Sequence, residues 1–278
     1  MKFKLYREYG ALNSPPVFDA LQKGILSLGH HEVSQNEDVS VIWSVLWNGR
    51  MANNQKIYER NKKESRQTLI LEVGTFNRGK TWKLSMDHVN QAGIFGNKMD
   101  IDVDRPKKLG IMLDAPRHQR RDEILIACQH DKSLQWANQP PLHVWVNQII
   151  TDIRGYSDRP IVVRPHPRCN LKGPIVGATI ETPKKIVNSY DDFDINYNYH
   201  CVINFNSGPC IQAAMKGVPI ICNKSSLAFD VSDVLENIEK IELKDRTSWI
   251  QRLTHTEWTC EELASGEPLQ RILKEKVA

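Results

Sequence analysis

The chain of 278 residues has no apolar run approaching the roughly 18 residues that a membrane-spanning helix needs. Its first residues, MKFKLYREYG, also lack the apolar core and the small-residue cleavage site of a secretory signal. We therefore expect a soluble protein of the cytoplasm that has no membrane partner.

Cysteine pairs with metal-binding spacing are absent as well. The six cysteines form no C-x-x-C pair, and three of them lie in or beside apolar runs typical of strands. We interpret them as reduced core residues rather than as zinc ligands or disulfides. Internal repeats and low-complexity tracts are also missing, and the hydrophobic fraction of 40% is that of an ordinary globular protein.

A strong net charge is missing too, because +4 is too small to indicate a nucleic-acid-binding protein by itself. The charge is unevenly distributed. Residues 50–83 contain nine Lys or Arg against three acids, an excess larger than that of the whole chain. This segment fits a polyanionic partner, or it is an ordinary solvated, charged face.

Strand and helix patterns alternate along the first part of the chain, which is typical of a parallel sheet. They predict strands at 2–6, 39–46 and 68–73, and helices at 17–28 and 55–66. From Gly74 to Pro106 the pattern weakens, and we expect a long functional or interdomain loop there.

The alternation restarts after this segment. It predicts strands at 109–113, 124–128, 161–164, 200–205 and 218–222, with helices at 143–154, 209–216 and 261–276. The prediction is therefore an α/β fold with two parallel-sheet domains, residues 1–106 and residues 107–278, whose terminal helix can pack back on the first domain.

Two strand ends in the second domain carry residues suited to binding an anion. The strand that ends at Arg164 continues as Pro165-His166-Pro167-Arg168. The prolines restrict the backbone around His166, and each arginine can grip a phosphate through paired N–H groups. A surface turn with solvated arginines is the alternative.

The other strand end runs into Asn206-Ser207-Gly208-Pro209 and a helix of small residues. Ser207 can cap this helix, Gly208 lets the backbone approach a ligand, and the helix start can bind an anion. A plain capped helix is the alternative.

These motifs resemble the donor-binding half of GT-B glycosyltransferases. The resemblance rests on the HP segment after one strand, the NS segment before a small-residue helix, and the strand Gly217-Val218-Pro219-Ile220-Ile221. Capsule-polymerising enzymes with HP and Ser-Ser motifs are similar over residues 159–230. The resemblance implies two Rossmann-like domains facing a central cleft, and a hexosyltransferase that depends on a UDP-sugar.

The segment Tyr9-Gly10-Ala11-Leu12-Asn13-Ser14, the chain length and the basic first half also resemble T-even phage DNA glucosyltransferases of the glucosyl-hydroxymethylcytosine type. This resemblance implies UDP-glucose as donor, a hydroxymethylated or already glucosylated cytosine in duplex DNA as acceptor, and the cytoplasm of the phage host. A capsule or lipopolysaccharide glycosyltransferase and a nucleotide-sugar epimerase are the alternatives.

The resemblance assigns donor binding to the second domain. The residues expected to hold the nucleotide sugar are Arg164, His166, Arg168, Asn206, Ser207, Gly208, Gln129 and Gln212. The segment Gln129-His130-Asp131 is equally consistent with a solvated turn. No obligatory metal is expected. The Asp-x-Asp pattern that could bind a metal occurs between Asp100 and Asp104, but this segment is the expected linker. A metal site in this segment is the alternative.

Transfer with inversion needs a base for the acceptor hydroxyl. Glu72 is the first candidate, since an acid near the end of an apolar strand is costly unless it is paired or functional. A buried ion pair is the alternative. Asp19 is the second candidate, although stabilisation of the helix start also explains it. Asp87 and His88 are the third, and a retaining reaction would need no such base.

Contacts with DNA are expected in the long loop, from Arg78, Lys80, Trp82, Lys83 and His88. Basic residues flanked by glycine can follow a phosphate backbone, and aromatic rings can stack on a sugar or an extruded base.

Overall fold

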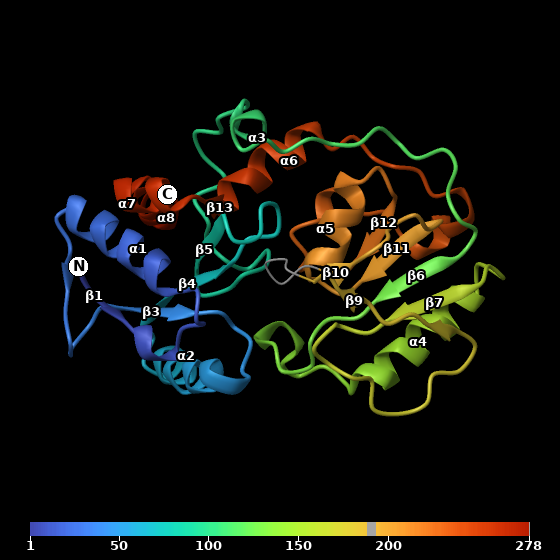
Figure 1. The fold of residues 1–278 in the computed structure, drawn as a ribbon, viewed down its shortest axis with the longest axis horizontal. Helices are drawn as coiled ribbons and strands as arrows, with labels where there is room; N and C mark the ends of the chain where they lie inside the picture. Colours follow the sequence, from blue (N-terminus) through green and yellow to red (C-terminus); the bar gives the residue numbers. More distant parts are fainter. Residues whose placement is uncertain (188–192, 278) are drawn as a thin grey trace. The chain divides into compact units, whose positions relative to one another are not determined.

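A computed structural model describes residues 1–187 and 193–277, which form two compact units (Figure 1). Unit 1 comprises Met1–Gly110 and Ile250–Ala278, and unit 2 comprises Ile111–Trp249. The boundary expected at residues 106 and 107 therefore lies inside unit 1, and the chain returns to unit 1 for its last segment. Within the described ranges, no helix is both long and apolar enough to cross a lipid bilayer.

Unit 1 is built on a six-stranded sheet of order β13-β5-β4-β3-β1-β2. The pairs among β1, β2, β3 and β4 are parallel, whereas β5 is antiparallel to both β4 and β13. The strands are β1 (Lys2–Leu5), β2 (His31–Glu32), β3 (Val39–Trp43), β4 (Gln67–Val73), β5 (Trp82–Met86) and β13 (Glu257–Trp258).

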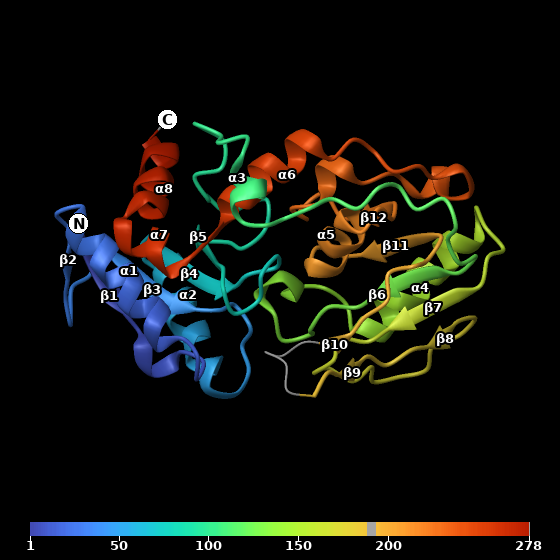
Figure 2. The same ribbon diagram turned by 45° about the horizontal axis from the view of Figure 1, so that its top comes forward.

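Helices cover both faces of this sheet. Figure 1 and Figure 2 show α7 and α8 beside α1, and Figure 1 shows α2 on the other face. Leu21, Leu71, Leu263 and Ile272 are fully buried in one core that joins α1, β4, α7 and α8. The helices are α1 (Pro15–Ser27), α2 (Asn53–Lys63), α3 (Arg105–Lys108), α7 (Cys260–Ser265) and α8 (Glu267–Val277), with 3-10 turns η1 (Arg7–Tyr9), η2 (Gly49–Ala52) and η6 (Thr254–Thr256).

The structure confirms the strands and helices predicted before Gly74, with ends that differ by up to three residues. The strand predicted to reach residue 46 stops at Trp43, because Ser44 takes a φ of 64°, which an extended strand cannot continue. The long loop predicted from Gly74 to Pro106 was wrong in part. It contains β5, which is buried throughout because it pairs with β4 on one side and β13 on the other.

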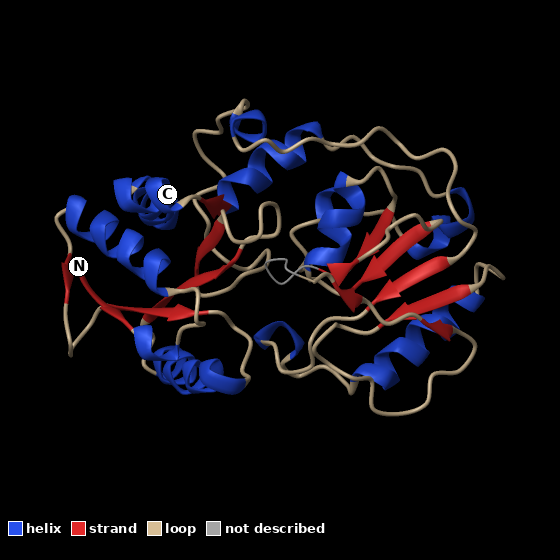
Figure 3. Ribbon diagram, viewed as in Figure 1, coloured by secondary structure: helices blue, strands red, loops and turns tan. Residues whose placement is uncertain are grey.

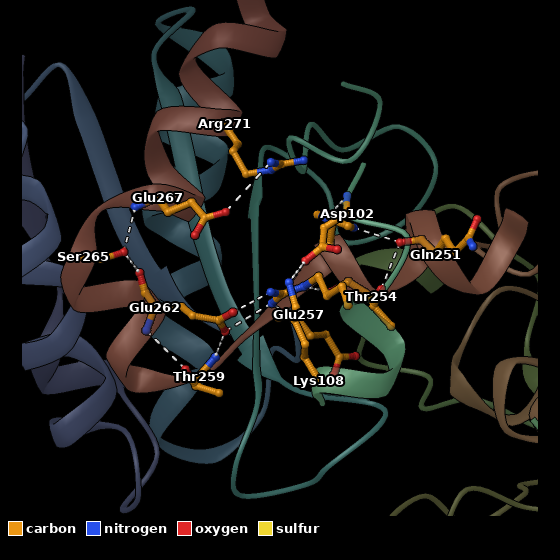
Figure 4. Close-up of polar contacts among 12 residues, drawn as sticks. Asp102, Lys108, Gln251, Thr254, Glu257, Thr259, Glu262, Ser265, Glu267 and Arg271 are labelled. Atoms are coloured by element: carbon orange, nitrogen blue, oxygen red, sulfur yellow. Dashed lines mark hydrogen bonds and ion pairs between the residues drawn. The ribbon is translucent and has the colours of Figure 1, made fainter. Parts of the chain in front are cut away.

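Polar contacts as well as apolar side chains hold the C-terminal segment in unit 1 (Figure 4). Thr259 and Glu262 form a capping box at the start of α7. The buried Arg105 pairs with Glu262, donates to the carbonyl oxygens of Thr254 and Glu257, and stacks on a buried indole. The predicted linker around Asp100–Asp104 therefore belongs to unit 1, where Asp102 pairs with Lys108 at 2.6 Å.

Unit 2 contains a five-stranded sheet of order β12-β11-β6-β7-β8, and every pair in it is parallel. The strands are β6 (Ile124–Ala127), β7 (Ile161–Arg164), β8 (Thr179–Ile180), β11 (Cys201–Asn204) and β12 (Ile220–Cys222). A separate antiparallel pair consists of β9 (Lys184–Lys185) and β10 (Phe193–Asp194).

Two larger helices cover the faces of this sheet, α4 (Leu142–Arg154) and α5 (Gly208–Met215) (Figure 1). The remaining elements are η3 (Leu134–Trp136), η4 (Phe229–Val231), η5 (Leu235–Lys240) and α6 (Thr247–Leu253), the last of which crosses the boundary between the units. Four of the five strands predicted here are confirmed. The strand predicted at 109–113 was wrong, because the following backbone instead bonds to the end of α5, with the Asp114 N–H donating to the Met215 carbonyl at 2.9 Å.

Candidate functional site

The parallel strands of unit 2 all end at one edge of the sheet. Figure 3 shows the longer strands as arrows that point the same way. The segments after β6, β7, β11 and β12 therefore meet at this carboxyl edge, where open α/β sheets bind their ligands. Most of the residues predicted to hold the donor lie in these segments.

Gln129 and Asn206 are joined at this edge. The backbone N–H of Asn206 donates to Gln129 Oε1 at 3.2 Å, and Asn206 Nδ2 donates to Ser225 Oγ at 2.9 Å. Their other amide atoms, Gln129 Nε2 and Asn206 Oδ1, are buried and have no hydrogen-bond partner. Gln129 is 2% exposed and Asn206 is 6% exposed, so water does not satisfy these atoms from the surface.

His130 extends this set of buried polar groups. It is 6% exposed, and its Nε2 atom also lacks a partner. The solvated turn that the sequence offered as an alternative for Gln129 and His130 is therefore wrong. The His130 ring lies beside that of His166, with centroids 5.1 Å apart. Burial lowers the pKa of His130, although the carboxylate of Asp131 acts in the opposite direction.

The start of α5 differs from the expected cap. Ser207 is the N-cap residue, but its side chain accepts no hydrogen bond from the first turn of the helix. Instead, Asn204 Oδ1 accepts from the Ser207 backbone N–H at 2.7 Å and from its hydroxyl at 3.2 Å. Gly208 opens the helix and the half-buried Gln212 follows one turn later. The serine side chain therefore does not cover the helix start, whose dipole attracts anions.

Arg164 makes contacts within unit 2 that the sequence did not indicate. Its Nη2 atom donates to Glu181 Oε1 at 2.9 Å, to the Asn196 carbonyl at 2.7 Å and to the Tyr199 hydroxyl at 3.2 Å. Its Nε and Nη1 atoms are buried without a partner. Arg168, in contrast, is exposed. Arg164 thus has a structural role in unit 2, and two of its nitrogen atoms are open to a further contact.

A group with metal-binding chemistry lies beside these residues. The ligand atoms of His130, Asp131 and Cys169 are within 4.8 Å of one another in the part of the chain that the structure describes. The His130 Nδ1 lone pair, however, already accepts a hydrogen bond from the Lys132 N–H at 3.1 Å. An ion bound through this nitrogen would have to displace that bond.

In unit 1, Glu72 lies near the carboxyl end of β4 and is half-buried. Its Oε2 atom accepts from the Ser44 hydroxyl at 2.7 Å, and its Oε1 atom accepts from the Val73 N–H at 3.0 Å. These contacts of Glu72 are with a hydroxyl and a backbone N–H. The structure therefore does not show the buried ion pair that was the alternative for this residue. Asp19 is 62% exposed at its side chain and pairs with Arg7 at 2.7 Å.

The residues expected to contact DNA divide into three groups. Arg78 and Lys80 are exposed on the turn that follows β4. Trp82 and Lys83 lie in the buried β5, so their expected placement in a loop was wrong. His88 follows Asp87, which accepts from the Thr68 N–H at the amino end of β4. The structure therefore separates His88 from the turn that carries Arg78 and Lys80.

A buried carboxylate from the C-terminal segment holds this turn. Glu257 is 1% exposed, and it accepts from the Thr75 N–H at 2.5 Å, the Phe76 N–H at 3.2 Å and the Thr81 hydroxyl at 3.0 Å. Glu257 was not among the site residues predicted from the sequence. Its only signal was an acid beside a tryptophan, far along the chain from the turn that it contacts.

The fold is that of the Rossmann-like α/β class seen in GT-B glycosyltransferases, which confirms the predicted fold class. The KpsC β-Kdo 2,7-transferase of Thermosulfurimonas dismutans is similar with a TM-score of 0.50 and 13% identity, over 99% of each chain. The KpsC β-Kdo 2,4-transferase of the same organism has a TM-score of 0.48 and 12% identity, over 95% of this chain and 98% of that one. No protein-family model and no curated protein matches the sequence.

Proposed function

We propose that the chain is a glycosyltransferase that moves glucose from UDP-glucose to a hydroxymethylated or already glucosylated cytosine in duplex DNA. The observation that supports a sugar-nucleotide site most directly is the cluster of unpartnered polar atoms on Gln129, His130 and Asn206. Each such buried atom costs about 1–3 kcal/mol when it lacks a hydrogen bond. A polar ligand at the carboxyl edge of unit 2 removes this cost.

Unit 2 binds the donor in this proposal. The diphosphate lies at the start of α5 and against His166, and Arg168 supplies a positive charge from the surface. Gln129 and Asn206 contact hydroxyl groups of the sugar, because side-chain amides both donate and accept hydrogen bonds. Gln212 extends the same surface along α5.

Unit 1 supplies the base. Glu72 takes the proton of the acceptor hydroxyl while that oxygen bonds to the anomeric carbon of glucose. The bond from this carbon to the diphosphate oxygen breaks, and UDP leaves with the electron pair. The Ser44 hydroxyl, which donates to Glu72 at 2.7 Å, orients the carboxylate.

The DNA acceptor is supported by the basic turn of unit 1. Arg78 and Lys80 are exposed, and Glu257 holds the turn through two backbone N–H groups. A rigid turn with exposed positive charge fits phosphate groups, whose neutralisation releases counterions. Replacing both residues by alanine is therefore expected to flatten the dependence of DNA affinity on salt.

A capsule-type glycosyltransferase is the second candidate, and the fold similarity to KpsC over nearly the whole chain favours it. It would use the same donor site with a carbohydrate acceptor. A nucleotide-sugar epimerase would need no acceptor.

One experiment separates these three functions. The protein is incubated with a panel of nucleotide sugars and with hydroxymethylated or glucosylated DNA, and the nucleosides are analysed by mass spectrometry. We expect a hexose on the modified cytosine with UDP-glucose. A hexose found only on added oligosaccharides indicates the capsule-type enzyme, and a new nucleotide sugar formed without DNA indicates an epimerase. An absence of all three products contradicts the proposal.

A further inference from the structure

Two histidines follow the ends of two neighbouring strands of the unit 2 sheet. His130 comes shortly after β6, and His166 comes shortly after β7, which pairs in parallel with β6. Their rings lie edge to face at 5.1 Å. Each histidine thus stands at the carboxyl edge, beyond the end of its own strand.

Each ring accepts a hydrogen bond from the backbone two residues further along. The Lys132 N–H donates to His130 Nδ1 at 3.1 Å, and the Arg168 N–H donates to His166 Nδ1 at 3.1 Å. A backbone N–H can only donate, so both Nδ1 atoms must be unprotonated. A neutral imidazole with a bare Nδ1 carries its proton on Nε2. Both rings therefore present Nε2–H as a donor.

One contact competes with this arrangement at His130. Asp131 Oδ1 lies 3.2 Å from His130 Nδ1, which would favour a proton on that nitrogen. Burial is the larger effect and lowers the pKa of His130, and the charges of Lys132 and Arg168 act in the same direction. The bond from the Lys132 N–H, whose donor is fixed by the backbone, is the contact that assigns the Nδ1 lone pair.

The donor that this arrangement creates on His130 is unused within the protein. Its Nε2 atom is buried and has no partner, although the ring is held in place on its other side. An unpaired N–H in a buried position is costly, and a phosphate oxygen is a strong acceptor for it.

We propose that His130 and His166 form a pair of neutral imidazole donors, each held in the Nε2–H form by a backbone N–H, that binds the phosphate oxygens of the donor nucleotide. His130 is thereby a substrate-binding residue in addition to those that the sequence indicated. The inference rests on the proposed function, which supplies a nucleotide-linked sugar as the ligand.

The first test measures the tautomers directly in the full chain. Proton–nitrogen correlation spectra of the imidazole rings are expected to show His130 and His166 with the proton on Nε2. His255 is an internal control that should carry its proton on Nδ1. Its Nε2 accepts from the Asp102 N–H at 3.2 Å, and its Nδ1 lies 2.8 Å from the Gln251 carbonyl. A proton on Nδ1 of His130 would overturn the proposal.

The second test measures binding of UDP and of inorganic pyrophosphate by calorimetry. His130→Ala is expected to weaken both by about 10-fold to 100-fold, the usual effect of losing a hydrogen bond to a charged group. His130→Gln places an amide N–H near the former Nε2 and is expected to restore most of the affinity, whereas His130→Asn places it near Nδ1 and is not. His118→Ala, at an exposed position of the same unit, is the matched control and should bind normally.

The outcomes distinguish this inference from the proposed function. Normal binding by His130→Ala, with wild-type binding intact, overturns the inference and leaves the function standing. If the wild-type protein binds neither UDP nor pyrophosphate, the proposed function is wrong and the histidine pair has no phosphate ligand.

Discussion

The geometry around Glu72 depends on an unusual backbone at Ser44. With its φ of 64°, Ser44 ends β3 and directs its hydroxyl to the Glu72 carboxylate while also accepting from the Leu46 N–H. A positive φ at a residue other than glycine costs free energy, and such strain is concentrated at functional sites. The arrangement fixes one carboxylate at the carboxyl edge of the unit 1 sheet.

Replacing Glu72 by glutamine should therefore slow sugar transfer and leave donor binding unchanged. The amide cannot take a proton, and loss of a general base typically reduces turnover by about 10²-fold to 10⁴-fold. Steady-state rates and UDP affinity test this. Asp19→Asn is the matched control, because Asp19 is exposed and pairs only with Arg7 in the contacts described above. Normal turnover in Glu72→Gln with slow turnover in Asp19→Asn would exchange the two assignments.

Arg164 shows how a predicted ligand contact can also be structural. Its planar guanidinium stacks near Tyr197 and Tyr199 while one nitrogen serves three acceptors. Lysine has neither the plane nor the fork. Arg164→Lys should lower the free energy of unfolding by about 2 kcal/mol, as expected for hydrogen bonds of a charged group. Urea denaturation measures this, and unchanged stability would show that the arginine serves the ligand alone.

The attachment of α7 to α1 depends on the absence of a side chain at Gly24. A Cβ atom added there would lie 2.1 Å from the Leu263 carbonyl oxygen, which is backbone and cannot move away by rotating. Gly24→Ala should therefore destabilise unit 1 by about 1–3 kcal/mol, in spite of the better helix propensity of alanine. Thermal unfolding tests this. Gly29→Ala is a poor control because its φ is positive, so Leu26→Ala, at an exposed position of α1, is preferable.

His255 makes the C-terminal segment sensitive to acid. Its buried ring has its pKa lowered to about 4, chiefly by burial, and both ring nitrogens are engaged in the neutral form. The folded state thus binds this proton more weakly than the unfolded state. The contribution of His255 to the free energy of unfolding is therefore fully present above pH 6.5, the ordinary pKa of histidine. It falls by up to about 3 kcal/mol as the pH decreases toward 4.

The variant His255→Asn provides the comparison. Its amide can still donate to the Gln251 carbonyl in place of Nδ1. Urea denaturation at several pH values should show a flatter decline between pH 6.5 and pH 4 than in the wild type. The other histidines with lowered pKa values are present in both proteins, so they do not affect the difference. Identical pH profiles would contradict the assignment.

At the scale of the whole molecule, unit 1 is made of two distant parts of the chain, whereas unit 2 is continuous. The side chains of Trp258, Leu263, Leu269 and Ile272 are fully buried in the unit 1 core. Each stabilises the fold by about 1.5–3 kcal/mol when buried. Since whole domains are stable by only about 5–15 kcal/mol, unit 1 should not fold without these residues.

Truncation after Trp249 should therefore unfold unit 1 and leave unit 2 folded. Hydrogen exchange is the measurement, with loss of protection in β1, β3 and β4 and retained protection in β6, β7 and β11. A peptide of residues 250–278 added in trans should restore protection in unit 1. Full protection of β3 and β4 in the truncated chain would contradict the prediction.

Much of this architecture follows from local patterns. The apolar strands β3, β4, β6, β7 and β11 and the helices α1, α2, α4 and α5 were predicted from periodicity and from glycine and proline positions. His166, Asn206 and Glu72 were singled out because polar residues at strand ends are visible in the sequence. Pairing of β5 with β13 was not visible, because a short strand acquires its burial only from neighbours elsewhere in the chain.

The sequence by itself determined two α/β sheets and the strand ends at which reactive residues stand, since hydrophobic periodicity and turn residues act over a few neighbouring positions. The tertiary structure alone decided that Gln129 and His130 are buried, that Glu257 reaches the turn after β4, and that the last segment completes unit 1. Burial and the partners of polar atoms depend on contacts between residues far apart in sequence, and these contacts exist only after the chain has folded.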